Sequence, residues 1–211
     1  MERQIREIMN AKGNTDPIGR LETLYKSFHL LERQKAFMNV IWEMAKHGGS
    51  KEKRLSLALV GHLHLASEYK EKIKECLDEY KYGSDRLALI ELLDLCGSLD
   101  DSWAIEFIKL IMMKSKTKND WEIYILAIRI SVATSEWRHA IQDLCENISS
   151  LDDEVVVDLF AYIHWVHPSE LINRLTSEFN PKVGKKIFLL NDEIRKRYEE
   201  IYAHFSYQPE N

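Results

Sequence analysis

Two histidines three residues apart stand out in the stretch AYIHWVHPSEL, residues 161–171. On one continuous helix, His164 and His167 would project from the same face, as a pair of metal ligands or an acid–base pair does. Pro168 follows directly, and a proline favours a helix end at the residue before it. The two histidines are therefore expected to straddle a turn and to have structural roles.

No other pattern predicts catalysis, a cofactor or a metal. Nucleophile motifs, phosphate-binding loops and dinucleotide fingerprints are missing from the sequence. His62 and His164 are expected at equivalent positions on the core stripe. They are three helical units apart, about 25–30 Å at the usual helix spacing, so they are not expected to share a metal. We therefore predict no catalytic residue, no cofactor and no metal ligand.

The composition favours a helical protein from a reducing compartment. Only 8 Gly and 4 Pro occur in 211 residues, fewer turn residues than an all-β fold needs. The three cysteines, Cys76, Cys96 and Cys145, are widely spaced and form neither a disulfide framework nor a zinc motif. The N-terminus lacks an apolar signal core, and no run approaches the roughly 18 apolar residues of a membrane span. We expect a cytoplasmic protein without a membrane partner.

A repeat of 34 residues organises most of the chain. One helix in each repeat carries three apolar columns on a single face, and a capping residue precedes it. The first column is Leu55, Leu89, Ile123 and Val157, the second is Leu59, Leu93, Ala127 and Ala161, and the third is Ala58, Leu92, Leu126 and Phe160. The expected caps are Asp16, Ser50, Ser84, Asn119 and Asp152. A second apolar helix follows in each repeat, starting near Ser67, Asp101, Ser135 and Ser169.

These patterns predict an all-α protein that forms an α-α superhelix of about five stacked helix-turn-helix units. Stacking is expected because an isolated helix pair cannot bury its apolar face. The units span about 14–49, 50–83, 84–117, 118–151 and 152–180, with a short helix before them and a C-terminal cap at 181–211. Residues 1–211 are expected to form a single helical-repeat domain. A non-repetitive helical bundle is the alternative.

The pattern resembles the α-solenoid families, especially HEAT-like repeat proteins, over about residues 14–180. The apolar columns and caps carry this resemblance, so it implies a scaffold and no particular functional residue. A tetratricopeptide array shares the 34-residue period. Its small-residue pattern is missing here, because the column of Gly61 continues as Leu95, Arg129 and Ile163.

The charge distribution argues against nucleic acid as a partner. Residues 1–54 carry 11 Lys and Arg against 7 Asp and Glu, whereas residues 84–115 carry 3 against 6 and residues 152–180 carry 1 against 6. Neutralising phosphates requires a basic groove, which an acidic body does not provide. Trp103 and Trp137 lie on the apolar stripe, where they are expected to pack in the core rather than stack on bases.

One helix carries more apolar residues than its core face requires. In DDSWAIEFIKLIMMKS, residues 100–115, a second apolar stripe contains Ile105, Ile108 and Met112, and Met113 lies beside it. Such a stripe is either covered by the rest of the chain or binds something. We take Ile105, Ile108, Met112 and Met113 as the candidate partner-binding residues, with burial by the C-terminal helices or by superhelical curvature as the alternative.

Together these features predict a non-enzymatic, protein-binding scaffold or adaptor. Its acidic surface would steer a basic partner, and an inhibitor or immunity-type protein that neutralises a basic toxin or nuclease is one concrete form. A HEAT-like nucleic-acid-binding or DNA-repair enzyme and a structural homodimer are the alternatives.

Overall fold

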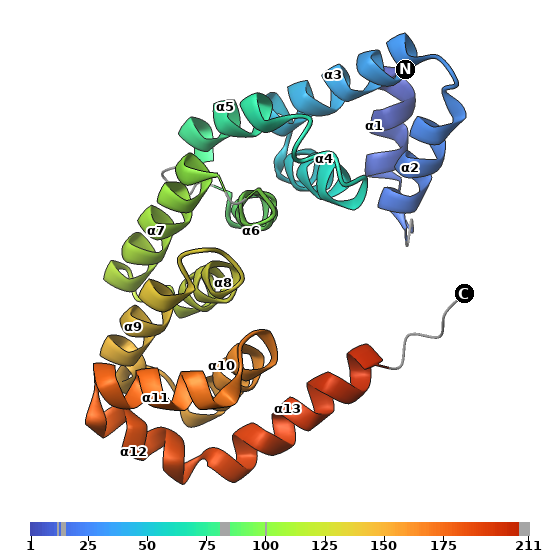
Figure 1. Ribbon diagram of the computed structural model, residues 1–211. Coiled ribbons are helices and arrows are strands. Elements are labelled where there is room, and N and C mark those ends of the chain that lie inside the picture. The colour runs from blue at the N-terminus through green and yellow to red at the C-terminus, as the bar shows by residue number, and fades with distance from the viewer. Residues whose placement is uncertain (12, 14–15, 81–84, 100, 207–211) are drawn as a thin grey trace. The chain divides into compact units, whose positions relative to one another are not determined.

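The computed structural model describes residues 1–11, 13, 16–80, 85–99 and 101–206, and these residues confirm the all-α prediction. They form thirteen α-helices and one 3-10 turn, and none of them lies in a strand (Figure 1). None of the described helices is long and apolar enough to cross a bilayer. The chain divides into two compact units, residues 1–107 and 108–211, and each is described separately below.

The first unit contains six helices and the start of a seventh. These are α1 (Glu2–Asn10), α2 (Pro17–Ser27), α3 (Leu31–His47), α4 (Ser50–His62), α5 (Lys70–Tyr80), α6 (Arg86–Gly97) and the first residues of α7 (Ser102–Thr117). Helix α4 packs against α1, α2, α3 and α6, and α5 packs against α3 and α6. The unit is therefore organised around α4, whose Leu57, Leu59 and Val60 are fully buried.

A carboxylate at the start of α4 attaches the N-terminal helix to this unit. Glu52 is 8% exposed, and its Oε1 accepts hydrogen bonds from Arg6 Nη1 at 2.6 Å and Asn10 Nδ2 at 3.3 Å. Its Oε2 accepts the Gly49 backbone N–H at 3.2 Å. Burial raises the pKa of Glu52, but these hydrogen bonds outweigh burial and the pKa lies below its ordinary value. Glu52 is therefore ionised when it joins α1 to α4.

The second unit contains the rest of α7 and six further helices. These are α8 (Trp121–Val132), α9 (Trp137–Asn147), α10 (Asp153–Val166), α11 (Ser169–Phe179), α12 (Pro181–Leu189) and α13 (Asn191–Ser206), with a 3-10 turn at Ile148–Ser150. Helix α10 packs against α8, α11 and α13. One hydrophobic core joins these helices, and its fully buried members include Tyr124, Ile128, Phe160 and Ile172.

Most residues of the predicted apolar columns are buried in both units. Leu55, Leu89, Ile123 and Val157 are 8%, 6%, 3% and 8% exposed. The second column, Leu59, Leu93, Ala127 and Ala161, is fully buried. In the third column Leu92 and Phe160 are fully buried, whereas Ala58 and Leu126 are half-buried. The helical periodicity of the sequence therefore identified the inward faces of α4, α6, α8 and α10 correctly.

Two of the predicted helix caps are wrong by one residue. Asp16 caps α2 as expected, because its Oδ1 accepts the Gly19 N–H at 2.8 Å. Asp120 rather than Asn119 caps α8, because Asn119 takes a left-handed conformation with φ of 55° in the preceding turn. Gly49 rather than Ser50 precedes α4, and Asp152 precedes α10 without a side-chain bond. The Ser84 cap lies outside the described residues.

Candidate functional site

The predicted binding stripe on α7 is largely covered. Ile108 is 1% exposed, Ile105 is half-buried, and Met112 packs against the core of the second unit. Met113 alone is well exposed, at 57%. The stripe therefore does not present a continuous apolar surface. The binding role of Ile105, Ile108, Met112 and Met113 stays a prediction, in which Met113 is the accessible member.

The histidine pair occupies a helix end. Helix α10 ends at Val166, and α11 starts at Ser169, so His167 lies in the turn as expected. Its Nε2 lies 2.8 Å from the Val132 carbonyl oxygen at the end of α8, and its ring stacks on Trp137 with centroids 4.3 Å apart. His167 therefore joins the ends of α8 and α10, and Trp137, expected in the core, is half-buried against it.

Neither His164 nor His62 belongs to a metal-binding cluster among the residues that the structure describes. His164 is half-buried, burial lowers its pKa, and no described residue hydrogen-bonds its buried Nε2. His62, expected on the core stripe, is instead 48% exposed and lies 2.8 Å from Glu22 of α2. Within the described ranges, no group of three or more His, Cys, Asp or Glu side chains is arranged to hold a metal ion.

Cys96 and Cys145 do not offer a reactive thiolate. Neither they nor Cys76 form a disulfide, and all three are buried. Burial raises the pKa of Cys96 and of Cys145 to about 12, and a nucleophilic cysteine needs a lowered pKa. These two side chains therefore act as small apolar groups in the core.

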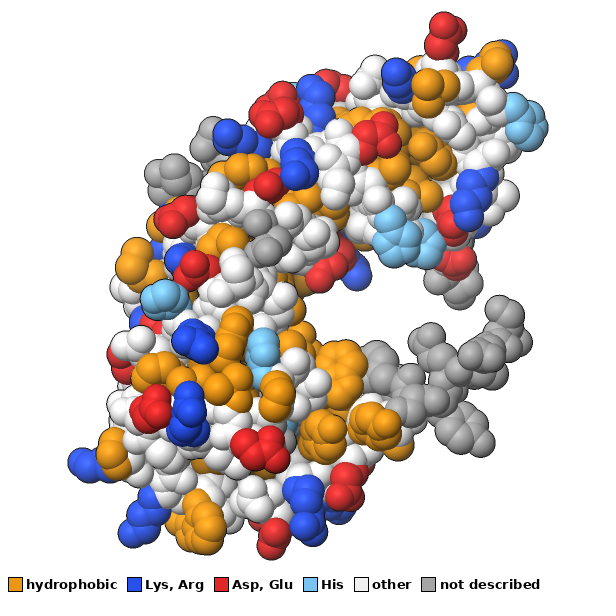
Figure 2. All heavy atoms as spheres, in the orientation of Figure 1, with side chains coloured by type: hydrophobic (Ala, Val, Ile, Leu, Met, Phe, Trp, Pro, Cys, Tyr) orange, Lys and Arg blue, Asp and Glu red, His pale blue; other side chains and the backbone are white. Residues whose placement is uncertain are grey.

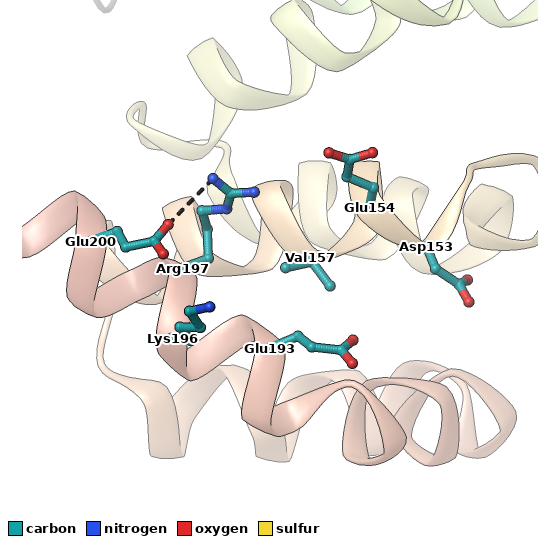
Figure 3. Close-up of a pocket in the computed structure, with 7 residues that line it drawn as sticks. All are labelled: Asp153, Glu154, Val157, Glu193, Lys196, Arg197 and Glu200. Atoms are coloured by element: carbon teal, nitrogen blue, oxygen red, sulfur yellow. Dashed lines mark ion pairs between the residues drawn. The ribbon is translucent and has the colours of Figure 1, made fainter.

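A surface pocket lies between α10 and α13 in the second unit (Figure 3). Its volume is about 380 Å³, and it is lined by Asp153, Glu154, Val157, Glu193, Lys196, Arg197 and Glu200. The two helices run side by side in the same direction (Figure 3). Arg197 on α13 fixes their register, because its guanidinium lies 2.9 Å from Asp158 of α10. Within α13, the same guanidinium lies 3.3 Å from Glu200.

The amphipathic pattern of α13 explains its position along α10. Ile194 is 1% exposed, and Tyr198 and Ile201 pack against the core of the second unit. Their spacing of four and three residues places all three on one face of the helix. The charged residues of the pocket flank this face and are therefore left at the edge of the contact between α10 and α13.

The carboxylates of this pocket differ in their partners. Asp153 lies 2.7 Å from Lys186 Nζ of α12, and Glu200 pairs with Arg197. Across the part of the chain that the structure describes, neither Glu154 nor Glu193 forms an ion pair. Four carboxylates face two cations around the pocket, so its local charge is negative and two of its carboxylates remain available to a cationic ligand.

Aromatic side chains lie beside the pocket and toward the C-terminal ends of both helices. Tyr162 and Trp165 of α10 have ring centroids 6.0 Å apart, and Tyr198 and Tyr202 of α13 stack with centroids 6.3 Å apart. Trp165 is 40% exposed and Tyr202 is 56% exposed. Figure 2 shows hydrophobic side chains gathered over α10 and α13. Arg129 of α8 lies over the Tyr162 ring, 5.8 Å from its centroid.

We call the pocket and these aromatic side chains the α10–α13 surface. It consists of the seven pocket residues named above together with Tyr162, Trp165, Tyr198 and Tyr202. Sequence reasoning missed this surface. The signals were present as Tyr162 with Trp165 and Tyr198 with Tyr202, each at helical spacing, but only the packing of α13 along α10 places the two pairs on adjacent helices.

The comparisons with known proteins do not place the chain in a family. A scan against family models finds no match, and searches of the curated proteins and of the solved structures also find none.

Proposed function

We propose that this chain is a protein-binding helical-repeat scaffold whose α10–α13 surface binds a basic partner. The observation that carries the proposal is the combination of exposed aromatic rings, Trp165 and Tyr202, with the available carboxylates Glu154 and Glu193 on the same two helices. The resemblance to HEAT-like α-solenoids belongs to the same proposal.

Two features support the repeat in the four helix-turn-helix units that contain α4 to α11. The column residues of α4, α6, α8 and α10 are buried at equivalent positions. The second helices of these units, α5, α7, α9 and α11, begin at Lys70, Ser102, Trp137 and Ser169, 32 to 35 residues apart. We therefore propose a stacked α-solenoid, with α1 before the units and α12 and α13 as the C-terminal cap.

Aromatic side chains support a binding role for the α10–α13 surface. Trp, Tyr and Arg are enriched among the residues that contribute most binding energy at protein interfaces, because they bury a large area with few rotatable bonds. Trp165 and Tyr202 can serve as such anchors. Tyr162 and Tyr198 are half-buried beside them and would hold the anchors in place.

The charge of the second unit favours a basic partner. Residues 108–211 carry 16 Asp and Glu against 13 Lys and Arg, a formal charge of −3. Glu154 and Glu193 concentrate negative charge at the pocket. Complementary charge raises the association rate and selects among partners. An inhibitor or immunity-type protein that binds a basic toxin or nuclease is one form of this function. A cytoplasmic location belongs to the proposal, because three buried cysteines that form no disulfide suit a reducing compartment.

The α7 residues have a secondary place in the proposal. Met113 is exposed and flexible, so it is suited to an adaptable contact. Ile105, Ile108 and Met112 would support that contact from beneath. A partner that binds α7 instead of α10–α13 would respond to a change at Met113 and not to changes at Glu154 or Glu193.

Affinity capture with matched charge reversals tests the proposal. Wild type, Glu154→Lys/Glu193→Lys and the control Glu170→Lys serve as baits, the control altering an exposed acid on α11. We expect a protein rich in Lys and Arg to be captured by wild type and by the control and to be lost from the double variant. Capture that is unchanged in the double variant, or an acidic partner, would contradict the proposal.

The two alternatives are separated by measurements on the purified chain. Tight, salt-sensitive binding of duplex DNA would favour the alternative of a nucleic-acid-binding or DNA-repair enzyme. A dimer in light scattering that dissociates in Met113→Glu would favour a homodimer through α7. Met113 is the appropriate position because Ile108 is buried, and a charge there would disturb folding instead.

A further inference from the structure

The end of α12 exposes two large apolar side chains. Phe188 is 78% exposed and Leu189 is 72% exposed, the highest values for large hydrophobic side chains among the residues that the structure describes. Isolated exposed apolar residues are common, but two adjacent ones at a helix end form a protruding apolar tip. The α10–α13 surface does not account for this tip, because neither Phe188 nor Leu189 belongs to that surface.

The opposite face of α12 fixes the direction of this tip. Val183 and Ile187 are 3% and 4% exposed and belong to the core of the second unit. Gly184 lies against α11, where a Cβ atom would come within 3.1 Å of Ser177 Oγ. Because close packing holds α12 on one face, the residues of its other face have to point outward.

That outward face is cationic. Residues 181–190 contain three lysines and no Asp or Glu. Lys182 and Lys185 are exposed, whereas Lys186 pairs with Asp153 at 2.7 Å. Leu189 follows Lys185 by four residues and Lys182 by seven, so the three share one side of the helix. In Figure 2, hydrophobic side chains lie next to Lys and Arg side chains where α12 reaches the surface.

A polar pocket opens beside the tip. It has a volume of about 200 Å³, and Phe188 lines it together with Asn173, Ser177 and Asn191. The hydroxyl of Ser177 already donates to the Asn173 carbonyl oxygen at 2.9 Å, but the side-chain amides of Asn173 and Asn191 can donate hydrogen bonds to an oxygen-rich group. Apolar side chains, lysines and polar donors therefore meet at one end of the second unit.

We propose that the α12 tip, which consists of Lys182, Lys185, Phe188 and Leu189, binds the surface of a membrane that contains anionic phospholipids. Phe188 and Leu189 enter the boundary between headgroups and acyl chains, and the two lysines contact the phosphates through flexible stems. A soft interface of this kind accommodates a protruding apolar tip without a preformed cavity. The expectation of no membrane partner rested on the lack of a spanning segment, and this proposal departs from that expectation because surface binding needs no such segment.

The expected affinity of the α12 tip for the membrane follows from its two kinds of contact. Each lysine near an anionic leaflet strengthens binding about fivefold, and salt screens this share. The apolar side chains contribute the part that is independent of salt. Binding should therefore be weak, reversible and dependent on both features.

Vesicle co-sedimentation of the full chain tests the proposal. The vesicles contain phosphatidylcholine alone or with about one third phosphatidylserine. The variants are Phe188→Ser/Leu189→Ser and Lys182→Glu/Lys185→Glu. The matched control is Leu30→Ser/Leu31→Ser, an adjacent apolar pair of the first unit that is 61% and 62% exposed. All six positions are exposed, so thermal melting should show that each variant folds as the wild type does.

We expect wild type and the control to sediment with phosphatidylserine vesicles, and each α12 variant to bind at least about fivefold less. Inorganic phosphate should not compete, because it offers no apolar phase to Phe188 and Leu189. The proposal is overturned if wild type does not bind these vesicles, if the α12 variants bind as well as wild type, or if the control loses binding equally. A dimer that disappears in Phe188→Ser/Leu189→Ser would also overturn it, because a second copy would then occupy the tip.

Discussion

Replacing Glu52 by Gln should lower the stability of the first unit. The substitution removes a negative charge and changes the shape of the side chain little. Three groups donate hydrogen bonds to the carboxylate, namely Arg6, Asn10 and the Gly49 N–H. A hydrogen bond to a buried charged group contributes roughly 1.5–3 kcal/mol, but the Arg6 side chain is 45% exposed and solvent screens its share. We expect Glu52→Gln to lower the free energy of unfolding by about 2 kcal/mol at neutral pH.

The pH dependence identifies the cause. The pKa of Glu52 is lowered in the folded state, because hydrogen bonds from Arg6, Gly49 and Asn10 outweigh burial. A lowered pKa means that the ionised carboxylate stabilises the fold above the unfolded pKa of about 4.3, and that this contribution is lost as the pH falls through the folded pKa. The difference between wild type and Glu52→Gln should therefore be full at neutral pH and shrink below about pH 4.

Urea unfolding followed by circular dichroism measures this difference at several pH values. The control is Glu7→Gln on α1, whose side chain is 61% exposed and pairs only at the surface with Arg3, so its effect should stay below about 0.5 kcal/mol. A deficit in Glu52→Gln that is equally large at low pH would assign the effect to packing. No deficit at neutral pH would show that Glu52 does not hold α1 on α4.

Three further predictions concern the core. Tyr124→Phe should cost about 1–2 kcal/mol in urea unfolding, because the buried hydroxyl donates to Asp143 Oδ2 at 2.7 Å; an unchanged stability would refute that contact. Phe160→Ala should cost about 3–5 kcal/mol because its ring is fully buried, and a loss near zero would place it outside the core. Since burial raises the pKa of Cys96 and of Cys145 to about 12, a thiol reagent at about pH 8 should label them only after denaturation, and rapid labelling of the native chain would contradict this.

Local patterns in the sequence predicted the helices well. The columns that begin at Leu55 and Leu59 were assigned to the inward face by spacing alone, and their members are buried. Helical periodicity is a property of neighbouring residues, so it can be read without tertiary information. Cap positions were less accurate, since Asn119 and Asp120 are both good caps and the turn geometry decides between them.

The proposed binding surface depends on contacts between residues that are distant in the sequence. Ile108 and Met112 were predicted to belong to an extra apolar stripe. The sequence of one helix does not show how many of its faces the neighbouring helices cover. Tyr162 and Tyr202 are forty residues apart and belong to one surface only because α13 packs along α10. His62 was expected on the core stripe, but its ring lies beside Glu22 of α2, a partner that helix spacing does not identify.

The central claim is that the α10–α13 surface binds a basic partner. Isothermal titration of the captured partner against wild type, Trp165→Ala/Tyr202→Ala and Met113→Ala tests it most directly, at low and at physiological salt. We predict that the double variant binds at least about tenfold more weakly, that Met113→Ala binds within about twofold of wild type, and that salt weakens the wild-type complex. An unchanged Kd for the double variant would contradict the claim, and a large loss in Met113→Ala alone would assign binding to α7.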